Sequence, residues 1–340
     1  MYQFVIPVHH VTWSTRSVLE GIYEKYNPKH IYVITSENEI KILKDKLNYW
    51  KIKNLTLLDE DNFFLNKYSL TKNDIVSQIT QNKPNYTPGW LYQQIIKLGA
   101  NDAIEQLDDV FVVWDTDLLP VNSWPILDKK KEKFALLQDK SYGNQDILNS
   151  WKNLIINVLG INPVEDERGT FTSHHMIFKK KHLKSLKLKF KDHFKSDQNW
   201  IKLIIKAANI YGSFGEYWTY ASWVNHINKD DLNYYPYEKY GLTTERFFDD
   251  GNGLFSKNYK KHISFKEQED FYPSYSSILN FIRKNYRTLP SSLSFETNIR
   301  HTKKRHDDTH LEEKRSIWRE KNPISKFNKF INLLTRIEDN

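Results

Sequence analysis

The stretch "VVWDTDLLPV", residues 112–121, places two carboxylates directly after a buried strand. The apolar run that ends at Trp114 predicts the strand, and Asp115 and Asp117 follow before the next apolar residues. Like charges this close either cap a turn in water, as aspartate often does, or bind a cation between them. The fold around the strand decides between these alternatives.

Strand and helix patterns alternate upstream of this stretch. Short apolar and β-branched runs at 4–8, 30–35 and 54–61 predict strands, and the amphipathic segments 17–26 and 39–50 predict helices between them. A β-α-β-α-β order predicts a parallel, doubly wound sheet with right-handed crossovers. The expected fold class is therefore α/β.

One further helix and a fourth strand complete this half of the chain. Residues 87–100 carry apolar side chains on one helix face, and we expect Gly99 to end that helix. Ser17 is expected to cap the helix at 17–26. Residues 108–117 are the fourth predicted strand, which carries the two acids at its end.

The carboxyl ends of parallel strands form the edge at which open α/β sheets bind ligands. Polar groups stand at three predicted strand ends, namely His9 with His10, Ser36 with Glu37, and Asp115 with Asp117. We expect these groups to converge on one crevice. Carboxylate oxygens bind Mg²⁺ or Mn²⁺, and such ions complete their coordination with water and substrate phosphates. The position of the paired acids therefore favours a metal site over a turn cap.

The composition narrows the possible chemistry. The 340 residues include no cysteine, which excludes disulfides and thiolate metal sites and leaves oxygen and imidazole ligands. Aromatic residues make up 14% of the chain, so we expect some of them to line a pocket that stacks on sugars or bases. The N-terminus shows no secretory signal, and no apolar run approaches the roughly 20 residues of a membrane span. A cytoplasmic location is therefore expected.

The net charge of +8 suits anionic partners such as nucleotide phosphates, nucleic acid or acidic lipid. The charge is unevenly distributed, since residues 178–195 contain eight lysines and one acid. This lysine-rich run is either a solvated helix face or a patch that faces an anion or a lipid.

The second half of the chain is less regular, and no internal repeat or low-complexity linker divides it. Residues 170–180 predict a strand that enters a helix, and residues 213–227 predict an aromatic helix. Residues 301–340 mix charges with apolar side chains near helical spacing. This tail is expected either to dock as a short helix on the rest of the chain or to contact a membrane surface or a partner.

Six segments occur in the order seen in bacterial and viral glycosyltransferases of the DUF6492 type: "FVIPVHH", "HIYVITS", "GWLYQQIIKL", "VVWDTDLLPV", "HHMIFKK" and "GEYWTYASWV". The chain resembles this family over roughly residues 2–265, most specifically in the Trp-x-x-Gln-Gln helix followed by the Asp-x-Asp strand. The resemblance implies a GT-A-like fold, with a Rossmann-type, mostly parallel sheet flanked by helices, an irregular acceptor-binding half and a helical C-terminal tail. It also implies the use of a nucleotide-diphosphate sugar.

The resemblance implies a role for each matching position. Asp115 and Asp117 would bind Mn²⁺ or Mg²⁺, and Glu216 would be the candidate base, because Trp218 replaces the second acid of the family pattern. Contacts with the acceptor would come from His174, His175 and Tyr217. Contacts with the donor would come from Pro7, Val8, His9, Trp90, Gln94, Lys97, Trp114, Asp115 and Thr116.

Structural alternatives remain open for several of these residues. Trp90 and Gln94 are also suited to packing and fixing a helix, and an acid at the start of a helix, such as Glu216, is favoured by the helix dipole without any role in chemistry. Of the two histidines at 174 and 175, one is expected to be functional and the other buried. His226 and His262 are further imidazole candidates for the metal, but their spacing supports neither.

The expected function is transfer of a sugar, as a hexosyl or deoxyhexosyl group, from a nucleotide diphosphate to a hydroxyl of a glycan in capsule, lipopolysaccharide or glycoprotein. The predicted division is a nucleotide-sugar-binding half at 1–125, an acceptor-binding half at 126–270 and a charged extension at 271–340, which offers peripheral contact with the inner face of a membrane. One alternative is a metal-dependent phosphatase, although such enzymes carry Asp-x-Asp on their first strand. The other is a basic nucleic-acid-binding protein, for which no recognition motif is present; no nucleic-acid partner is expected.

Overall fold

The computed structural model describes most of the first 230 residues and parts of the remainder. The described ranges are 1–50, 52–81, 86–123, 127–128, 131–136, 145–166, 171, 174–229, 232–236, 244–248, 272–285 and 292–296.

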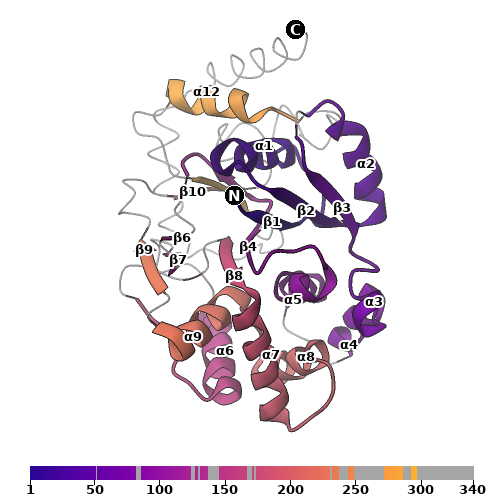
Figure 1. Cartoon of the computed structure of the whole chain (residues 1–340), viewed down its shortest axis with the longest axis vertical. Coiled ribbons are helices and arrows are strands. Elements are labelled where there is room, and N and C mark those ends of the chain that lie inside the picture. Colours follow the sequence, from indigo (N-terminus) through magenta and orange to yellow (C-terminus); the bar gives the residue numbers. More distant parts are fainter. Residues whose placement is uncertain are drawn as a thin grey trace.

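A five-stranded sheet in the order β3-β2-β1-β4-β8 forms the centre of the fold (Figure 1). Its first four strands in the chain pair in parallel, and β8 pairs antiparallel to β4. The strands are β1 (Gln3–Pro7), β2 (His30–Thr35), β3 (Leu55–Asp59), β4 (Val110–Trp114) and β8 (His175–Lys179). The predicted α/β class and mostly parallel sheet are therefore confirmed.

Helices cover both faces of this sheet. In Figure 1, α1 (Thr15–Tyr26) lies above the sheet and α5 (Pro88–Ala103) lies below it, while α2 (Glu37–Leu47) follows β2. The short helices α3 (Leu65–Tyr68) and α4 (Lys72–Thr80) connect β3 to α5. With helices on both faces, β1, β2 and β4 are almost entirely buried, which explains their continuous apolar sequences.

The second half of the chain adds a group of helices below the sheet (Figure 1). This group consists of α6 (Gln145–Leu154), the π-helix η1 (Ile155–Leu159), α7 (Lys180–Phe194), α8 (Trp200–Tyr211) and α9 (Glu216–Asn228). Above the sheet, α12 (Tyr275–Asn285) packs on α1. The strand predicted at 170–180 and its following helix are confirmed as β8 and α7, and the aromatic helix predicted at 213–227 is confirmed as α9.

Two small three-stranded sheets accompany the central one. The first has the order β10-β11-β5 and the second the order β6-β7-β9. Their strands are β5 (Leu118–Pro120), β6 (Leu127–Asp128), β7 (Lys131–Leu136), β9 (Leu232–Pro236), β10 (Thr244–Phe248) and β11 (Ser292–Glu296). Between β4 and β5 the chain makes an acidic turn, formed by Asp115, Thr116 and Asp117, in which the N–H of Leu118 donates a hydrogen bond to the carbonyl of Asp115 at 3.1 Å.

The prediction of Ser17 as a helix cap is wrong. Helix α1 begins at Thr15, so Ser17 lies inside the first turn, where its side chain is buried and its hydroxyl donates a hydrogen bond to the carbonyl of Ser14 at 2.9 Å. Next to the start of the helix, the backbone N–H of Thr12 donates a hydrogen bond to Oγ1 of Thr15, not to the side chain of Ser17, at 2.8 Å. The small, buried side chain of Ser17 therefore contributes to packing rather than to capping.

The prediction that Gly99 ends its helix is also wrong, because α5 continues to Ala103. The glycine is explained by close packing. A Cβ atom at position 99 would lie 2.5 Å from the ring of Phe64 and 3.0 Å from that of Trp200. Gly99 therefore allows α3 and α8 to approach the middle of α5.

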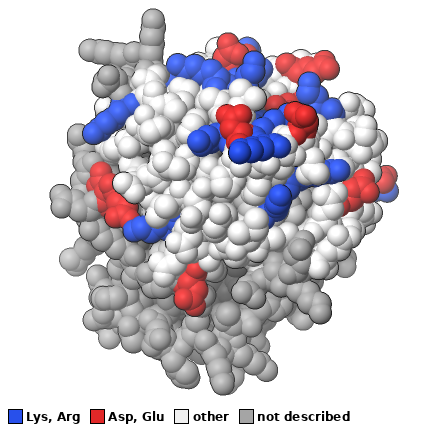
Figure 2. All heavy atoms as spheres, turned by 90° about the horizontal axis from the view of Figure 1, so that it is seen from below, with Lys and Arg blue, Asp and Glu red and all other residues white. Residues whose placement is uncertain are grey.

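The lysine-rich run at 178–195 covers the end of β8 and all of α7, but its lysines do not form one exposed face. Lys179 and Lys187 are buried. On the face seen in Figure 2, basic side chains are interspersed with acidic ones. The alternative of an anion- or lipid-facing patch remains a prediction.

None of the helices in the described part of the chain has both the length and the apolar character that crossing a membrane requires. The helix predicted within 301–340 lies outside the described residues. The division of the chain at residues 125 and 270 stays a prediction.

Candidate active site

The register of two neighbouring strands brings an aspartate and a histidine together. Trp114, the last residue of β4, pairs with His175, the first residue of β8. One step further along, the N–H of Asp115 donates a hydrogen bond to the carbonyl of His174 at 2.8 Å. The side chains that follow β4 and precede β8 therefore meet at the carboxyl edge of the parallel strands.

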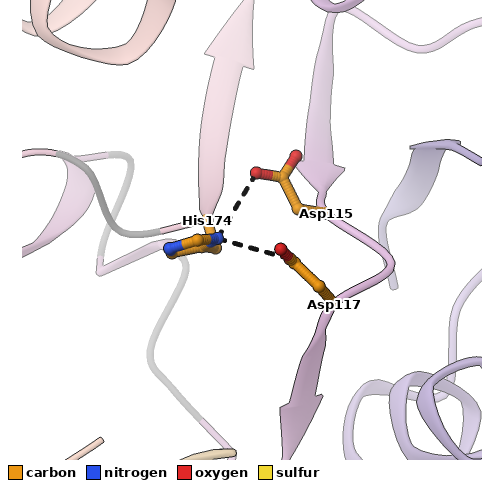
Figure 3. A group of neighbouring side chains, drawn as sticks. All are labelled: Asp115, Asp117 and His174. Carbon is orange, nitrogen blue, oxygen red and sulfur yellow. Dashed lines mark hydrogen bonds and ion pairs between the residues drawn. The ribbon is translucent and has the colours of Figure 1, made fainter. Parts of the chain in front are cut away.

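Asp115, Asp117 and His174 form a cluster with the composition of a metal site (Figure 3). One ligand atom from each residue lies within 4.8 Å of the other two. Nδ1 of His174 is 3.3 Å from Oδ1 of Asp117 and 3.7 Å from Oδ2 of Asp115. Two carboxylates and one imidazole suit a divalent ion such as Mn²⁺ or Mg²⁺, so the donor set fits the predicted cofactor.

The backbone of His174 has an unusual conformation that contributes to this arrangement. Its φ angle is +58°, in the left-handed region that residues other than glycine rarely adopt. Such a conformation costs about 1–2 kcal/mol for an ordinary L-residue. The surrounding structure must offset that cost, as is common at functional sites.

The other oxygen of Asp115 is bound by two residues from different helices. Oδ1 lies 2.6 Å from Nζ of Lys97 on α5 and accepts a hydrogen bond of 3.1 Å from the hydroxyl of Tyr217 on α9. The same ammonium group lies 4.6 Å from the centre of the Tyr217 ring. Asp115 is therefore held on one side by Lys97 and Tyr217 and faces the cluster on the other.

Glu216 shares the ammonium group of Lys97. Its Oε1 lies 2.7 Å from Nζ, and both side chains are buried. Burial by itself would lower the pKa of Lys97, but the attraction of Asp115 and Glu216 outweighs this effect and raises the pKa above its usual value. Lys97 is therefore positively charged at neutral pH.

The charges in this part of the site do not balance. The carboxyl groups of Asp115, Asp117 and Glu216 lie near a single ammonium group, that of Lys97, and His174 is positive only when protonated. Burial raises the pKa of Asp115 above its usual value, against the attraction of Lys97. Unbalanced buried charge is unfavourable. A divalent cation bound between Asp115, Asp117 and His174 would neutralise the excess.

The structure also brings the end of β1 beside the acidic turn. The hydroxyl of Thr116 lies 3.5 Å from the carbonyl of Pro7. His9, two residues beyond, is exposed, and the centre of its ring is 4.0 Å from that of His10. Partial burial of the His9 ring, together with the positive charge of His10 and Lys72, lowers the pKa of His9 below its usual value. The imidazole of His9 is therefore largely neutral at physiological pH.

Some predicted donor contacts have their side chains in the core. Trp114 has no exposed surface, and its indole N–H donates to the carbonyl of Leu118 at 2.7 Å. Val8 is also buried, and its backbone N–H bonds the carbonyl of Ile34. Neither side chain presents a surface to a ligand, and the contact of Trp114 and Val8 with a donor stays a prediction.

Two further predictions concern the face of α5 near its start. The ring of Trp90 stacks on that of Trp151, with centres 5.9 Å apart and planes inclined by 11°. Gln94 is buried, and its side-chain amide has no hydrogen-bond partner in the described structure. Their contact with a donor stays a prediction.

The two adjacent histidines have different surroundings, and the predicted burial of one of them is confirmed for His175. His174 joins the acids, whereas His175 is buried with its ring 4.6 Å from that of Trp114. Trp218, which stands in place of the second family acid, donates to the carbonyl of Val164 at 2.6 Å. His226 is exposed at the end of α9, and His262 lies outside the described residues.

The pairing of Lys97 with both Asp115 and Glu216 was not predicted from the sequence. A signal was present in "IIKLGA", residues 95–100, where a lysine interrupts an otherwise apolar stretch. A buried lysine requires a buried acid. The identity of that acid depends on packing between α5 and α9, which the local pattern does not encode.

Residues 19–272 match the model of a protein family described as "Family of unknown function (DUF6492)". The chain belongs to the DUF6492 family. No curated protein matches this DUF6492 chain.

Several solved structures resemble the chain distantly. Mouse xyloside xylosyltransferase 1 in its apo form has a TM-score of 0.41 at 11% identity, with 69% of this chain and 84% of that one covered. The galactosyltransferase LgtC in complex with donor and acceptor sugar analogues has a TM-score of 0.39 at 11% identity, covering 94% and 99%. The glycosyltransferase GlyE of Streptococcus pneumoniae TIGR4 has a TM-score of 0.38 at 10% identity, covering 97% and 63%. At such TM-scores, the function has to be argued from the geometry of the site.

Proposed function

We propose that this DUF6492 protein is a metal-dependent glycosyltransferase that moves a sugar from a nucleotide diphosphate to an acceptor hydroxyl. The observation that supports this proposal is the cluster of Asp115, Asp117 and His174, with ligand atoms within 4.8 Å of one another at the carboxyl edge of parallel strands. That edge is where open α/β sheets bind their ligands.

Asp117, His174 and Oδ2 of Asp115 would hold the divalent ion. When bound, the ion neutralises the negative charge that develops on the diphosphate as the sugar leaves. Lys97 and Tyr217 keep Asp115 in place through its other oxygen. The buried position of these side chains limits competition from water for the same oxygens.

The donor nucleotide would lie along the end of β1. The contact between Thr116 and Pro7 supports this placement, because it joins the acidic turn to that strand end. The exposed ring of His9 offers a flat face on which a base or ribose could stack, and ring nitrogens that could form hydrogen bonds with it. Trp90 and Gln94 on α5 remain proposed contacts with the donor. Tyr217, His174 and His175 remain proposed contacts with the acceptor.

The acceptor would be a glycan hydroxyl of capsule, lipopolysaccharide or glycoprotein, and the transferred group a hexosyl or deoxyhexosyl unit. The sequence prediction that Glu216 removes the acceptor proton is not part of this proposal, because Oε1 of Glu216 lies 2.7 Å from the ammonium group of Lys97. Contact of the C-terminal tail with a membrane remains a separate prediction.

Transfer assays with a panel of sugar nucleotides test the proposal. The wild-type protein is expected to hydrolyse or transfer at least one sugar in the presence of Mn²⁺, and chelation of the metal is expected to stop the reaction. The Asp117→Asn variant is expected to lose this activity, whereas Asp45→Asn, at an exposed position on α2, is expected to keep it. Full activity of Asp117→Asn would contradict the proposal.

A further inference from the structure

The two carboxylate oxygens of Asp115 face different surroundings. Oδ1 lies 2.6 Å from Nζ of Lys97 and accepts a hydrogen bond from the hydroxyl of Tyr217 at 3.1 Å. Oδ2 is the oxygen nearer to His174, at 3.7 Å from its Nδ1. A carboxylate fixed through one oxygen cannot turn, so the direction of the other oxygen is fixed as well.

Lys97 is an unusual residue for the middle of a packed helix. Its side chain is 4% exposed, and the residues on both sides, Ile96 and Leu98, belong to the core. Placing an ammonium group there is unfavourable unless carboxylates offset the loss of hydration. Both partners of Lys97, Asp115 and Glu216, lie on other elements of the fold.

Glu216 is suited to holding Lys97 in place. It is the first residue of α9, where the helix dipole favours a negative charge. Its side chain is 8% exposed and lies 2.7 Å from the lysine. The next residue, Tyr217, binds Asp115 directly, so the start of α9 supports the aspartate in two ways.

We propose that Lys97 is a positioning residue for the metal ligand Asp115, and that Glu216 acts as the counter-ion that fixes Lys97. This role rests on the proposed function in one respect, namely that Asp115 binds a divalent ion. Lys97 and Tyr217 direct Oδ2 of Asp115 toward Asp117 and His174. Glu216 acts through Lys97 and touches neither the ion nor the acceptor.

Binding of Mn²⁺, followed by electron paramagnetic resonance in the absence of any sugar nucleotide, tests this role. Tyr217→Phe removes one hydrogen bond to Asp115 without changing a charge. Loss of a group that orients a metal ligand typically weakens metal binding by roughly 10- to 100-fold. We expect a loss within this range for Tyr217→Phe, with the melting temperature in the absence of metal recorded for every variant.

The effect of Lys97→Met on the affinity for Mn²⁺ distinguishes a positioning role of the lysine from an effect of its charge alone. If the ammonium group acted only through its charge, its removal would tighten the binding of a cation. A positioning role predicts weaker binding, by roughly 10-fold or more. Lys187→Met is the matched control, because Lys187 is a buried lysine that bonds Asp102, away from the three ligands.

Glu216→Gln completes the test. We expect it to weaken Mn²⁺ binding in the wild-type background and to have no further effect in the Lys97→Met background, because Glu216 acts through the lysine. A direct effect of charge would persist in both backgrounds. A general base would instead leave Mn²⁺ binding unchanged and lower turnover by about 10²- to 10⁴-fold.

The outcomes separate this inference from the proposed function. Unchanged Mn²⁺ binding by Tyr217→Phe and Lys97→Met, with binding lost in Asp117→Asn, would overturn the positioning role and leave the metal site intact. Failure of the wild-type protein to bind Mn²⁺ would overturn both. Mn²⁺ binding with the expected variant pattern, but without turnover of any sugar nucleotide, would support the positioning role and count against the glycosyltransferase.

Discussion

Nδ1 of His174 lies 3.3 Å from Oδ1 of Asp117, although the two residues are 57 positions apart in the chain. The left-handed backbone of His174 accompanies this contact. The pairing of β4 with β8 brings the two backbones together, and the backbone conformation at position 174 is part of the geometry in which the ring meets the carboxylate.

The strain at His174 predicts an order of stability among its variants. His174→Gly removes both the ring and the penalty of the left-handed conformation, whereas His174→Ala removes only the ring. The glycine variant is therefore expected to be more stable to urea by about 1 kcal/mol. Both variants should bind Mn²⁺ more weakly than the wild type. Equal stability of the two would show that position 174 is not left-handed in solution.

Packing around α5 predicts opposite effects for two glycine substitutions in the same helix. Gly99→Ala places a Cβ atom 2.5 Å from the Phe64 ring and is expected to destabilise the protein by about 1–3 kcal/mol. Gly89→Ala meets no atom within 4 Å and is expected to be neutral or to stabilise by up to about 1 kcal/mol. Urea unfolding of the two variants checks this difference, and a stable Gly99→Ala protein would contradict the packing.

Lys187 predicts a pH dependence of stability. It lies on α7 beside Asp102, and burial, partly offset by Asp102, lowers its pKa from 10.5 to about 8. Between these pH values the unfolded chain binds the proton more tightly than the folded chain. The free energy of unfolding from this group therefore rises with pH, by up to about 3 kcal/mol.

Urea unfolding between pH 7.5 and 9.0 measures part of this rise at pH values where tyrosines, with an ordinary pKa of about 10, remain mostly protonated. Lys187→Met should remove the rise, while Lys184→Met, at an exposed position on the same helix, should retain it. Identical pH profiles for Lys187→Met and the wild type would show that Lys187 keeps its ordinary pKa.

Metal binding predicts a shift in thermal stability. An ion that binds only the folded state raises the free energy of unfolding by about 2.7 kcal/mol when its free concentration is 100 times its Kd. Mn²⁺ should therefore raise the melting temperature of the wild type and of Asp45→Asn, but not that of Asp117→Asn. A nucleoside diphosphate added with Mn²⁺ should raise it further. Equal shifts in all three proteins would place the ion elsewhere.

The sequence predicted the fold class and the position of Asp115 and Asp117 at the end of the fourth strand, because both depend on local patterns. Strand runs such as 30–35 and the run before Asp115 are readable from apolar residues alone. The pairing of β4 with residues 175–179 could not be predicted from the sequence, because tertiary packing sets this antiparallel pairing. His174 was therefore predicted as an acceptor contact, and its position beside Asp115 and Asp117 was not predicted.

Tertiary packing also explains why the contacts among the buried polar residues were not predicted. Lys97, Asp115 and Glu216 were each predicted as site residues, but the contacts between them depend on how α5 and α9 meet the end of β4. Ser17 and Gly99 were assigned to helix ends from residue preference, whereas their small size serves close packing inside helices. Residue preference is a weak guide wherever tertiary packing sets the requirement.

The antiparallel edge strand β8 has a consequence for how the chain folds. Asp117 and His174 are 57 positions apart in the chain, so the contact between them closes a large loop, and the entropy of that loop must be lost before the contact forms. Contacts of such high sequence separation form slowly compared with local ones. Capacity for Mn²⁺ should consequently return later than helical circular dichroism during refolding, which makes the ion a reporter of the completed tertiary topology.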